Sequence, residues 1–219
     1  MPLLFVRFPS KFSDMKRLIA LALFAGAVFA QTVTLTPTGP ATTYPGQTVT
    51  LTVTMTGSSG QSVAGVQWTA GYPVGFTGGS PTVSSADGIL GDSAQCGPLA
   101  CVVVGSTISM ADGPLATIPV TVGNSVAPGN FTIPLTGIIG ATGGGLNVPG
   151  MTAGPPYSLK VLSTCDLNAD GNVNVQDVQI VISAVIGSGT CPASITGGCT
   201  LITILQEIIA ANGGACKVP

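Results

Sequence analysis

The stretch Thr48-Val49-Thr50-Leu51-Thr52-Val53-Thr54-Met55 alternates strictly between hydroxyl-bearing and apolar side chains. Because successive side chains of a β-strand point to opposite faces, this period of two predicts a half-buried strand. The apolar side chains would pack on a hydrophobic core, and the threonines would face the solvent.

Further segments with a similar pattern recur on both sides of this stretch, between residues 31 and 162. They are residues 33–35, 63–68, 101–109, 115–122, 131–135 and 157–162. Turn-forming pairs such as Asp112-Gly113 and Pro128-Gly129 separate the segments, and no helical period of useful length appears among them. Many short strands joined by such turns predict an antiparallel β-sandwich.

Charged residues are scarce along the whole chain. Its 219 residues include six Lys or Arg, eight Asp or Glu and no His. Four of the six cations precede residue 31, namely Arg7, Lys11, Lys16 and Arg17. Only Lys160 and Lys217 follow residue 31, and two cations cannot neutralise a phosphate backbone. This excludes nucleic acid as a partner. The lack of His excludes Ser-His and Cys-His catalysis and imidazole metal sites.

Residues 1–30 contain the parts of a secretory signal peptide. Met15-Lys16-Arg17 is a basic segment, residues 18–30 are apolar, and Val28-Phe29-Ala30 is a small-residue cleavage site. We expect translation to start at Met15 and a mature chain to begin at Gln31, as in an exported, extracellular bacterial protein. No uncharged apolar run is long enough to span a bilayer, so no stable membrane insertion is expected.

Export places the six cysteines in an oxidising compartment, where disulfides are expected. Their spacing favours one local bridge in the first domain, between Cys96 and Cys101. Two more bridges are expected in the second domain, among Cys165, Cys191, Cys199 and Cys216. Apart from Lys217, which follows Cys216, no cation adjoins these cysteines in the sequence to lower a thiol pKa, and this disfavours a cysteine nucleophile.

The most specific motif of the chain is Asp166-Leu167-Asn168-Ala169-Asp170-Gly171-Asn172-Val173-Asn174-Val175-Gln176-Asp177. It fits an EF-hand-type calcium loop, whose spacing turns alternate oxygen-bearing groups towards one point. The competing interpretation is an Asn- and Asp-rich turn without a metal. The expected Ca²⁺ ligands are the side chains of Asp166, Asn168, Asp170 and Asp177, the backbone carbonyl of Asn172, and a direct or water-mediated oxygen of Asn174.

Two apolar segments of helical length follow, at residues 175–186 and 201–211. Residues at helical spacing form one apolar stripe on each. The stripes are Val178, Val181, Ile182 and Val185 on the first, and Leu201, Ile204, Leu205 and Ile208 on the second.

Aligning the two segments reveals an internal repeat with a degenerate second loop. Thr203 falls opposite Asp177, and the first three ligand positions become Pro192, Ser194 and Thr196. We therefore expect a single Ca²⁺ site. A bridge between Cys191 and Cys199 could hold the ends of the second loop where an ion cannot.

The duplicated loop and helix with the pattern D-x-N-x-D-G-x-x-N-x-x-D resembles a dockerin domain, over residues 164–216. The preceding sandwich resembles a cohesin domain. That second resemblance rests on Pro45-Gly46-Gln47, on Val63-Ala64-Gly65-Val66-Gln67-Trp68 with Tyr72-Pro73, and on residues 113–122 with Ala127-Pro128-Gly129-Asn130-Phe131. The expected fold is thus mainly β, with domains at 31–162 and 163–219.

The resemblance implies further properties. Cohesins are nine-stranded jelly-roll-like sandwiches that bind dockerins, and dockerins are small α modules that bind cohesins when Ca²⁺ is present. Such pairs assemble complexes that degrade extracellular polysaccharides. Positions 10 and 11 of each dockerin loop carry partner specificity, and here they are Val175-Gln176 and Leu201-Ile202. Apolar residues at these positions would suit an apolar interface with a partner, and they would equally suit an intramolecular core. Dockerin termini lie close together, which implies a bridge between Cys165 and Cys216.

Three functions compete at this stage. The first is a non-catalytic adaptor or scaffold that binds secreted cohesin- or dockerin-bearing proteins, or a second copy of itself. The second is a carbohydrate-binding sandwich that would bind polysaccharide, although Trp68 is in phase with Val66 on an apolar strand face. Its candidate stacking residues are Trp68, Tyr72, Tyr44 and Phe76.

The third function is a glycosidase, which needs a pair of carboxylates. The sandwich offers Asp87, Asp92 and Asp112, two of which begin Asp-Gly turns. We therefore expect no catalysis.

Overall fold

The computed structural model describes residues 32–84, 93–97, 100–104, 108–192, 195 and 197–216. The chain divides into two units, Met1–Gln31 and Thr32–Pro219, and all described residues belong to the second. The expected signal peptide at residues 1–30 lies outside the described residues. Among the described helices, none combines the length and the hydropathy of a membrane span.

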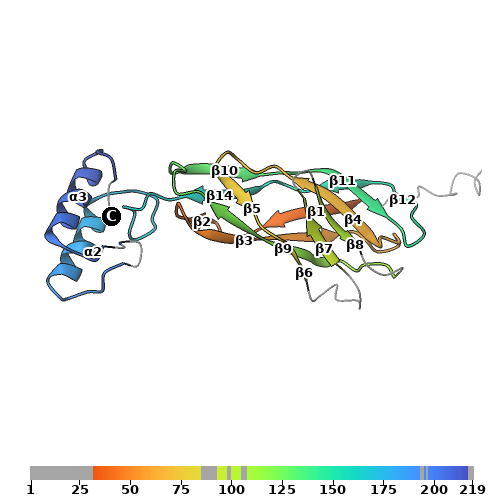
Figure 1. The fold of residues 1–219 in the computed structure, drawn as a ribbon, viewed down its shortest axis with the longest axis horizontal. Coiled ribbons are helices and arrows are strands. Elements are labelled where there is room, and N and C mark those ends of the chain that lie inside the picture. The colour runs from red at the N-terminus through yellow and green to blue at the C-terminus, as the bar shows by residue number, and fades with distance from the viewer. Residues whose placement is uncertain are drawn as a thin grey trace, which may run out of the picture. The chain divides into compact units, whose positions relative to one another are not determined.

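Most of the regular elements in the described chain are short strands (Figure 1). They are β1 (Val33–Thr38), β2 (Thr42–Thr43), β3 (Thr48–Thr56), β4 (Gly65–Ala70), β5 (Phe76–Gly78), β6 (Thr82–Val83), β7 (Ser93–Cys96), β8 (Cys101–Val104), β9 (Gly113–Val122), β10 (Gly129–Ile133), β11 (Leu135–Ala141), β12 (Asn147–Val148), β13 (Met151–Ala153) and β14 (Tyr157–Val161).

The strands form three sheets. The first has the order β13-β1-β3-β9-β5, with β6 also paired to β9, the second has the order β12-β11-β4-β8-β7, and the third has the order β10-β14-β2. The predicted mainly β, sandwich-like fold is thus confirmed. Its strands are antiparallel except for the pairs β1–β13 and β14–β2, which are parallel.

Two predicted strands differ from those observed. The segment 131–135 is split between β10 and β11 at Pro134, because proline has no N–H to donate to a sheet ladder. In the segment 101–109, the strand β8 covers Cys101–Val104, residues 105–107 lie outside the described residues, and Ile108 lies in a bend.

The core lies between the apolar faces of the first and second sheets. In β3 the side chains of Val49, Leu51, Val53 and Met55 are buried, as the alternation predicts. They belong to one hydrophobic cluster with Trp68 of β4, which is fully buried. Burial of this apolar area is the main force that holds the two sheets together.

The outer face of the first sheet carries threonine instead of charge. Thr48 and Thr121 lie side by side with their hydroxyl oxygens 2.9 Å apart, and those of Thr82 and Thr117 are 2.6 Å apart. Cross-strand hydroxyl pairs of this kind add modest stability to a sheet. They also let an almost uncharged sandwich keep a polar face towards water.

Two helices follow the strands, α2 (Val175–Val185) and α3 (Leu201–Ala211), close to the predicted bounds. Each starts at a capping box, in which the N-cap side chain and the third helical residue satisfy each other's backbone N–H. The pairs are Asn174 with Asp177 and Thr200 with Thr203. This arrangement explains why two such short β-branched segments are helical.

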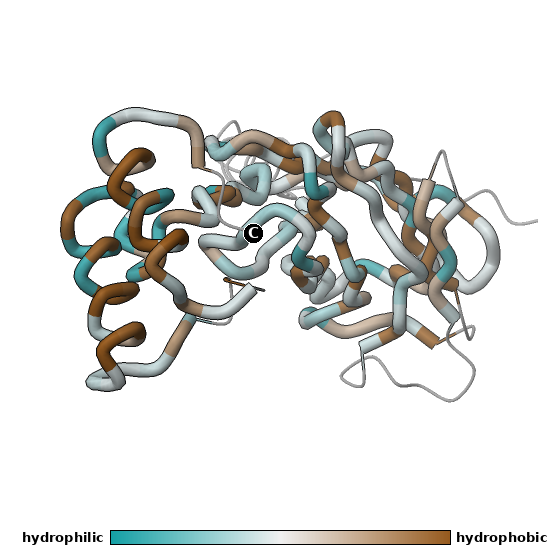
Figure 2. The backbone as a smooth tube through the Cα atoms, turned by 60° about the vertical axis from the view of Figure 1, so that its left-hand side comes forward, coloured by the Kyte–Doolittle hydropathy of each residue, from teal (hydrophilic) through white to brown (hydrophobic). Residues whose placement is uncertain are grey.

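The predicted apolar stripe of α3 is not the face that the helix buries. Its buried residues are Thr203, Glu207 and Ala210, whereas Leu201 and Leu205 are exposed. The capping box and a hydrogen bond from the Thr203 hydroxyl to the Gly198 carbonyl (3.2 Å) turn the polar side of the helix inward. Figure 2 shows hydrophobic residues, in brown, along both helices. On α2 the stripe is partly correct, since Val178 and Val181 are buried but Ile182 is not.

Candidate calcium loop and interaction surfaces

The first predicted ligand, Asp166, is almost completely buried at the start of the loop. Its Oδ2 accepts a hydrogen bond from the Gly171 N–H at 2.8 Å. Its Oδ1 is buried too, but finds no donor among the described residues. An unpaired buried carboxylate oxygen is costly, and a bound cation would remove that cost. This oxygen is the feature of the loop that best fits Ca²⁺.

Short-range hydrogen bonds curl the middle of the loop. Asn168 Oδ1 accepts from the Asp170 N–H (3.0 Å), and Asp170 Oδ1 accepts from the Asn172 N–H (2.8 Å). Gly171 has a φ of +91°, a conformation that glycine adopts without strain. The chain thus reverses where the motif predicts its sharp turn.

Asp177 closes the loop from the first turn of α2. Its Oδ1 accepts from the N–H groups of Leu167 (2.7 Å) and Asn168 (3.2 Å), and its Oδ2 accepts from the Asn174 N–H (2.8 Å). Asn174 Oδ1 in turn caps α2 by accepting from the Gln176 N–H at 2.8 Å. The two ends of the loop are therefore tied together by a fully buried carboxylate.

In the described part of the chain, no group of three or more His, Cys, Asp or Glu side chains is placed to hold a metal ion by itself. A Ca²⁺ shell at this loop would therefore need amide, backbone or water oxygens beside its carboxylates. Calcium accepts such mixed oxygen shells readily. The residue types of the loop fit this requirement, because three of its six predicted ligands are asparagines.

The pKa values of Asp166 and Asp170 are shifted in opposite directions. Burial raises the pKa of Asp166, and the negative charges of Asp177 and Asp170 raise it further, although the Gly171 N–H opposes them. The Asn168 amide and the Asn172 N–H lower the pKa of Asp170. Without a cation, Asp166 is thus the unfavourable charge of the loop.

The second loop has no such carboxylates and is closed by a disulfide. Cys191 is bonded to Cys199, with their Cα atoms 5.6 Å apart, and Thr203 occupies the place of Asp177. The other bonds join Cys165 to Cys216 and Cys96 to Cys101. All three are the pairs considered from the sequence. Ser194 and Thr196 lie outside the described residues.

Sequence reasoning missed Glu207 on α3. It is fully buried, and neither of its carboxylate oxygens finds a hydrogen-bond donor among the described residues. Burial raises its pKa to about 7, helped by the negative charge of Asp177. The repeat alignment could have found it, because setting Thr203 opposite Asp177 also sets Glu207 opposite the buried Val181.

The residues predicted to bind a partner are all exposed. They start the two helices: Val175 and Gln176 on α2, and Leu201 and Ile202 on α3. The large apolar side chains exposed by more than half along these helices define the helical apolar surface. They are Val175, Leu201, Ile202, Leu205 and Ile209.

A second exposed apolar group lies on the outer face of the second sheet. Ile139 of β11 is paired with Gln67 of β4, which is paired with Val102 of β8, and Val104 lies two residues further on the same face. Ile139 and Val104 are each about half exposed (52% and 49%). We name Val102, Val104 and Ile139 the sheet apolar surface, with Gln67 as a polar residue between them.

Two of the four candidate stacking residues are buried and cannot belong to an exposed platform, and for Trp68 the phase with Val66 favours this core position. Trp68 and Phe76 are buried in the core. Tyr44 donates its hydroxyl to the Asp166 carbonyl at 2.8 Å. Tyr72 is half-buried beside a pocket.

Of the candidate glycosidase carboxylates, Asp87 and Asp92 lie outside the described residues. Asp112 accepts hydrogen bonds from the N–H groups of Ser58 (2.7 Å) and Gly57 (3.0 Å). The bonds from Ser58 are the main reason why the pKa of Asp112 is lowered. The Asp112 carboxylate therefore holds the loop at Gly57 and Ser58, and its lowered pKa favours the ionised form that accepts these hydrogen bonds.

No family model and no curated protein matches the sequence. Among solved structures the chain is similar to cohesin modules. A non-cellulosomal cohesin from Archaeoglobus fulgidus is 17% identical, with a TM-score of 0.48 over 60% of this chain and 92% of that one. A cohesin module of a family 33 glycoside hydrolase from Clostridium perfringens is 14% identical, with a TM-score of 0.49 over 60% and 97%. A type I cohesin–dockerin complex from Clostridium thermocellum contains a chain that is 9% identical, with a TM-score of 0.48 over 59% and 93%.

Proposed function

We propose that this chain is a secreted, non-catalytic interaction protein of the cohesin–dockerin type. Its C-terminal module binds one Ca²⁺ in the loop 166–177 and presents the helical apolar surface to a partner protein. Its sandwich offers the sheet apolar surface to a second partner. The partners are cohesin- or dockerin-bearing secreted proteins, or further copies of this chain. An involvement in extracellular polysaccharide degradation rests on the sequence resemblance.

The observation that carries the proposal is the reversed polarity of α3. An amphipathic helix on a protein surface normally buries its apolar stripe and hydrates its polar stripe. In α3 the polar stripe of Thr203 and Glu207 is buried, while Leu201, Ile202 and Leu205 face outward. Clustered exposed apolar residues of this size mark interaction sites on soluble proteins.

Calcium would act on this surface through the start of α2. Val175 follows directly after the N-cap residue Asn174, and the capping partner Asp177 holds the loop backbone. An ion bound by Asp166, Asn168 and Asp170 would fix the loop and therefore the first turn of the helix. Partner binding should consequently require Ca²⁺.

The two apolar surfaces are free of charged side chains. Binding at either surface should therefore depend on apolar burial, at about 25 cal/mol per Å² removed from water. It should respond weakly to ionic strength, because electrostatic steering needs charges on both sides.

The test is sedimentation velocity of the full secreted chain, alone and mixed with a purified cohesin module or a purified dockerin module. Each mixture is measured with Ca²⁺ and with chelator. The double change L201D/I202D places two charges in the helical apolar surface. The matched control is Val74→Asp, since Val74 is an exposed apolar residue (98%) outside both surfaces.

We expect a complex, or self-association, that forms with Ca²⁺, is lost in chelator and in L201D/I202D, and persists in Val74→Asp. If every sample sediments as a monomer under all conditions, the proposed function is wrong. A complex that survives both chelator and L201D/I202D would place the interface elsewhere and equally contradict the proposal.

A further inference from the structure

A pocket opens at the edge of the sandwich, where the first and second sheets end side by side. Its walls come from the end of β4 and the residues after it, from β5 and the residues after it, and from the hairpin of β7 and β8. Both β5 and β7 are the last strands of their sheets. The volume is about 380 Å³, within the range of small-molecule sites.

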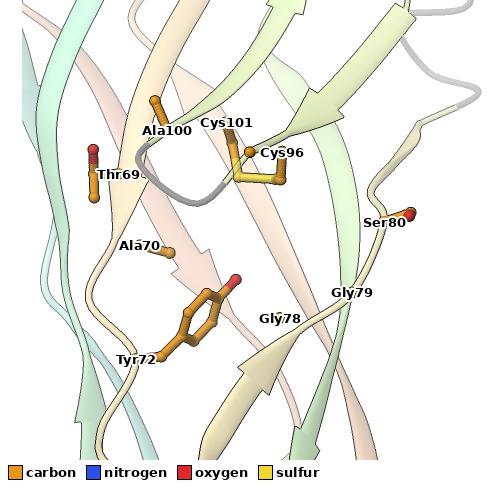
Figure 3. Close-up of a pocket in the computed structure, with 10 residues that line it drawn as sticks. Thr69, Ala70, Tyr72, Gly78, Gly79, Ser80, Cys96, Ala100 and Cys101 are labelled. Carbon is orange, nitrogen blue, oxygen red and sulfur yellow. A yellow bond between two sulfur atoms is a disulfide. The ribbon is translucent and has the colours of Figure 1, made fainter.

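The hairpin wall of this pocket is cross-linked. Cys96 and Cys101 are paired in register across the hairpin and joined by a disulfide, and the Gly97 N–H donates to the Ala100 carbonyl at 2.8 Å. Figure 3 shows the Tyr72 ring projecting into the hollow, with the disulfide beyond its hydroxyl. A ligand would therefore meet a preformed shape and would lose little affinity to ordering the protein.

Glycine makes room for the Tyr72 ring. A Cβ on Gly78 would lie 2.4 Å from the Tyr72 hydroxyl oxygen and 2.5 Å from the ring carbon that bears it. The next residue, Gly79, would similarly meet the Pro119 ring at 2.9 Å. The Tyr72 ring therefore packs directly against the backbone of Gly78 in β5.

The lining is uncharged and combines apolar surface with a few hydroxyl groups. Thr69, Tyr72 and Ser80 contribute hydroxyl groups, and the other lining residues are Ala70, Gly78, Gly79, Cys96, Gly97, Ala100 and Cys101. The Tyr72 hydroxyl makes no hydrogen bond to any residue that the structure describes, and burial raises its pKa. A partly buried tyrosine usually has a hydrogen-bond partner, so this hydroxyl is available to a ligand.

We propose that this pocket binds one or two neutral sugar units of a carbohydrate. A sugar ring has an apolar C–H face, which suits the Tyr72 ring, and a rim of hydroxyls that both donate and accept hydrogen bonds. The hydroxyls of Tyr72 and Ser80 can do the same. A charged ligand would lose its hydration without gaining a counter-charge. This site differs from the exposed stacking platform that the sequence left open as an alternative, and it does not depend on the Ca²⁺ loop.

The test is a ¹⁵N–¹H NMR titration of the full secreted chain, with its disulfides formed, using cellobiose, xylobiose and lactose as neutral probes. Digalacturonic acid is the charged probe. Ala100→Leu fills the pocket without removing a polar group, and Tyr72→Ala removes the ring. Tyr72→Phe keeps the ring and the fold but removes the hydroxyl. Leu146→Ala is the control, because Leu146 is exposed on a loop that is not part of the pocket.

We expect saturable shifts at the backbone amides of residues 69–72, 78–80, 97 and 100 with at least one neutral disaccharide, and none with digalacturonic acid. Binding should weaken at least tenfold in Ala100→Leu and Tyr72→Ala and severalfold in Tyr72→Phe, and remain unchanged in Leu146→Ala and in chelator. The proposal is overturned if no neutral probe gives saturable shifts at these amides, or if Ala100→Leu binds as well as the parent chain. Because chelator should not affect sugar binding, this result is separable from failure of the proposed function.

Discussion

Buried side chains differ in kind between the sandwich and the C-terminal module. In the sandwich they are nearly all apolar, from Leu35 and Leu51 to Trp68. In the module, four of the buried side chains carry oxygen, namely Asp166, Asp177, Thr203 and Glu207. The sandwich can therefore be stable through hydrophobic burial alone, whereas the module needs caps, disulfides and, in our proposal, an ion.

This difference teaches that the two regions should respond to different perturbations. Removing apolar volume should weaken the sandwich and spare the loop. Removing a covalent link or changing the protonation of a buried carboxyl should act on the module. Single and paired substitutions can therefore separate the stability of the sandwich from that of the module.

Trp68→Ala should destabilise the sandwich by about 3 to 5 kcal/mol, the usual cost of deleting a large buried aromatic side chain. Trp68 is fully buried in the core cluster. The measurement is the free energy of unfolding in denaturant, followed by near-UV circular dichroism. Ca²⁺ affinity should stay at the parent value, and a parallel loss of affinity would show that the two regions are not energetically separate.

The disulfides of the module should differ in their contributions. The bond between Cys165 and Cys216 spans 51 residues, and the bond between Cys191 and Cys199 spans eight. Loop-closure entropy gives about 4 kcal/mol for the first and about 2.5 kcal/mol for the second. Denaturant unfolding of the paired Cys→Ser variants, followed by far-UV helix signal, measures both. If the second variant proved the less stable of the two, chain entropy would not be the main cause.

A smaller effect should appear in the pH dependence of stability, with opposite signs in the two regions. The pKa of Glu207 is raised to about 7 from an ordinary value of 4.5. The folded module therefore holds this proton more tightly than the unfolded chain does, and its stability should fall as pH rises from about 4.5 to 7. The pKa of Asp112 in the sandwich is lowered instead, so its contribution should be lost as pH falls below the ordinary aspartate range.

Glu207→Gln and Asp112→Asn are the matched variants for this comparison. Calcium-free protein is unfolded in denaturant at several pH values. Glu207→Gln should remove the decline above pH 4.5 and leave the acid side unchanged, and Asp112→Asn should do the reverse. If Glu207→Gln left the decline intact, another group, such as Asp166 with its raised pKa, would be its cause.

The sequence predicted the features whose pattern belongs to one segment alone. The alternation of residues 48–55 predicts β3 and its buried face, and the spacing of the loop 166–177 predicts its turn at Gly171. Two-residue strands such as β2 and β6 carry no pattern of their own, because pairing with β14 and β9 defines them. The buried face of α3 could not be predicted from its period, since a cap residue, Thr203, decides it.

The central claim is that one Ca²⁺ in the loop 166–177 organises the module and leaves the sandwich unaffected. The most direct measurement is isothermal titration of the calcium-free chain with Ca²⁺, combined with hydrogen exchange of the same samples. We expect one site, its loss in Asp166→Ala, and Ca²⁺-dependent protection in residues 166–185 with unchanged protection in β3 and β9. Two sites, no site, or equal protection of α2 with and without Ca²⁺ would contradict it.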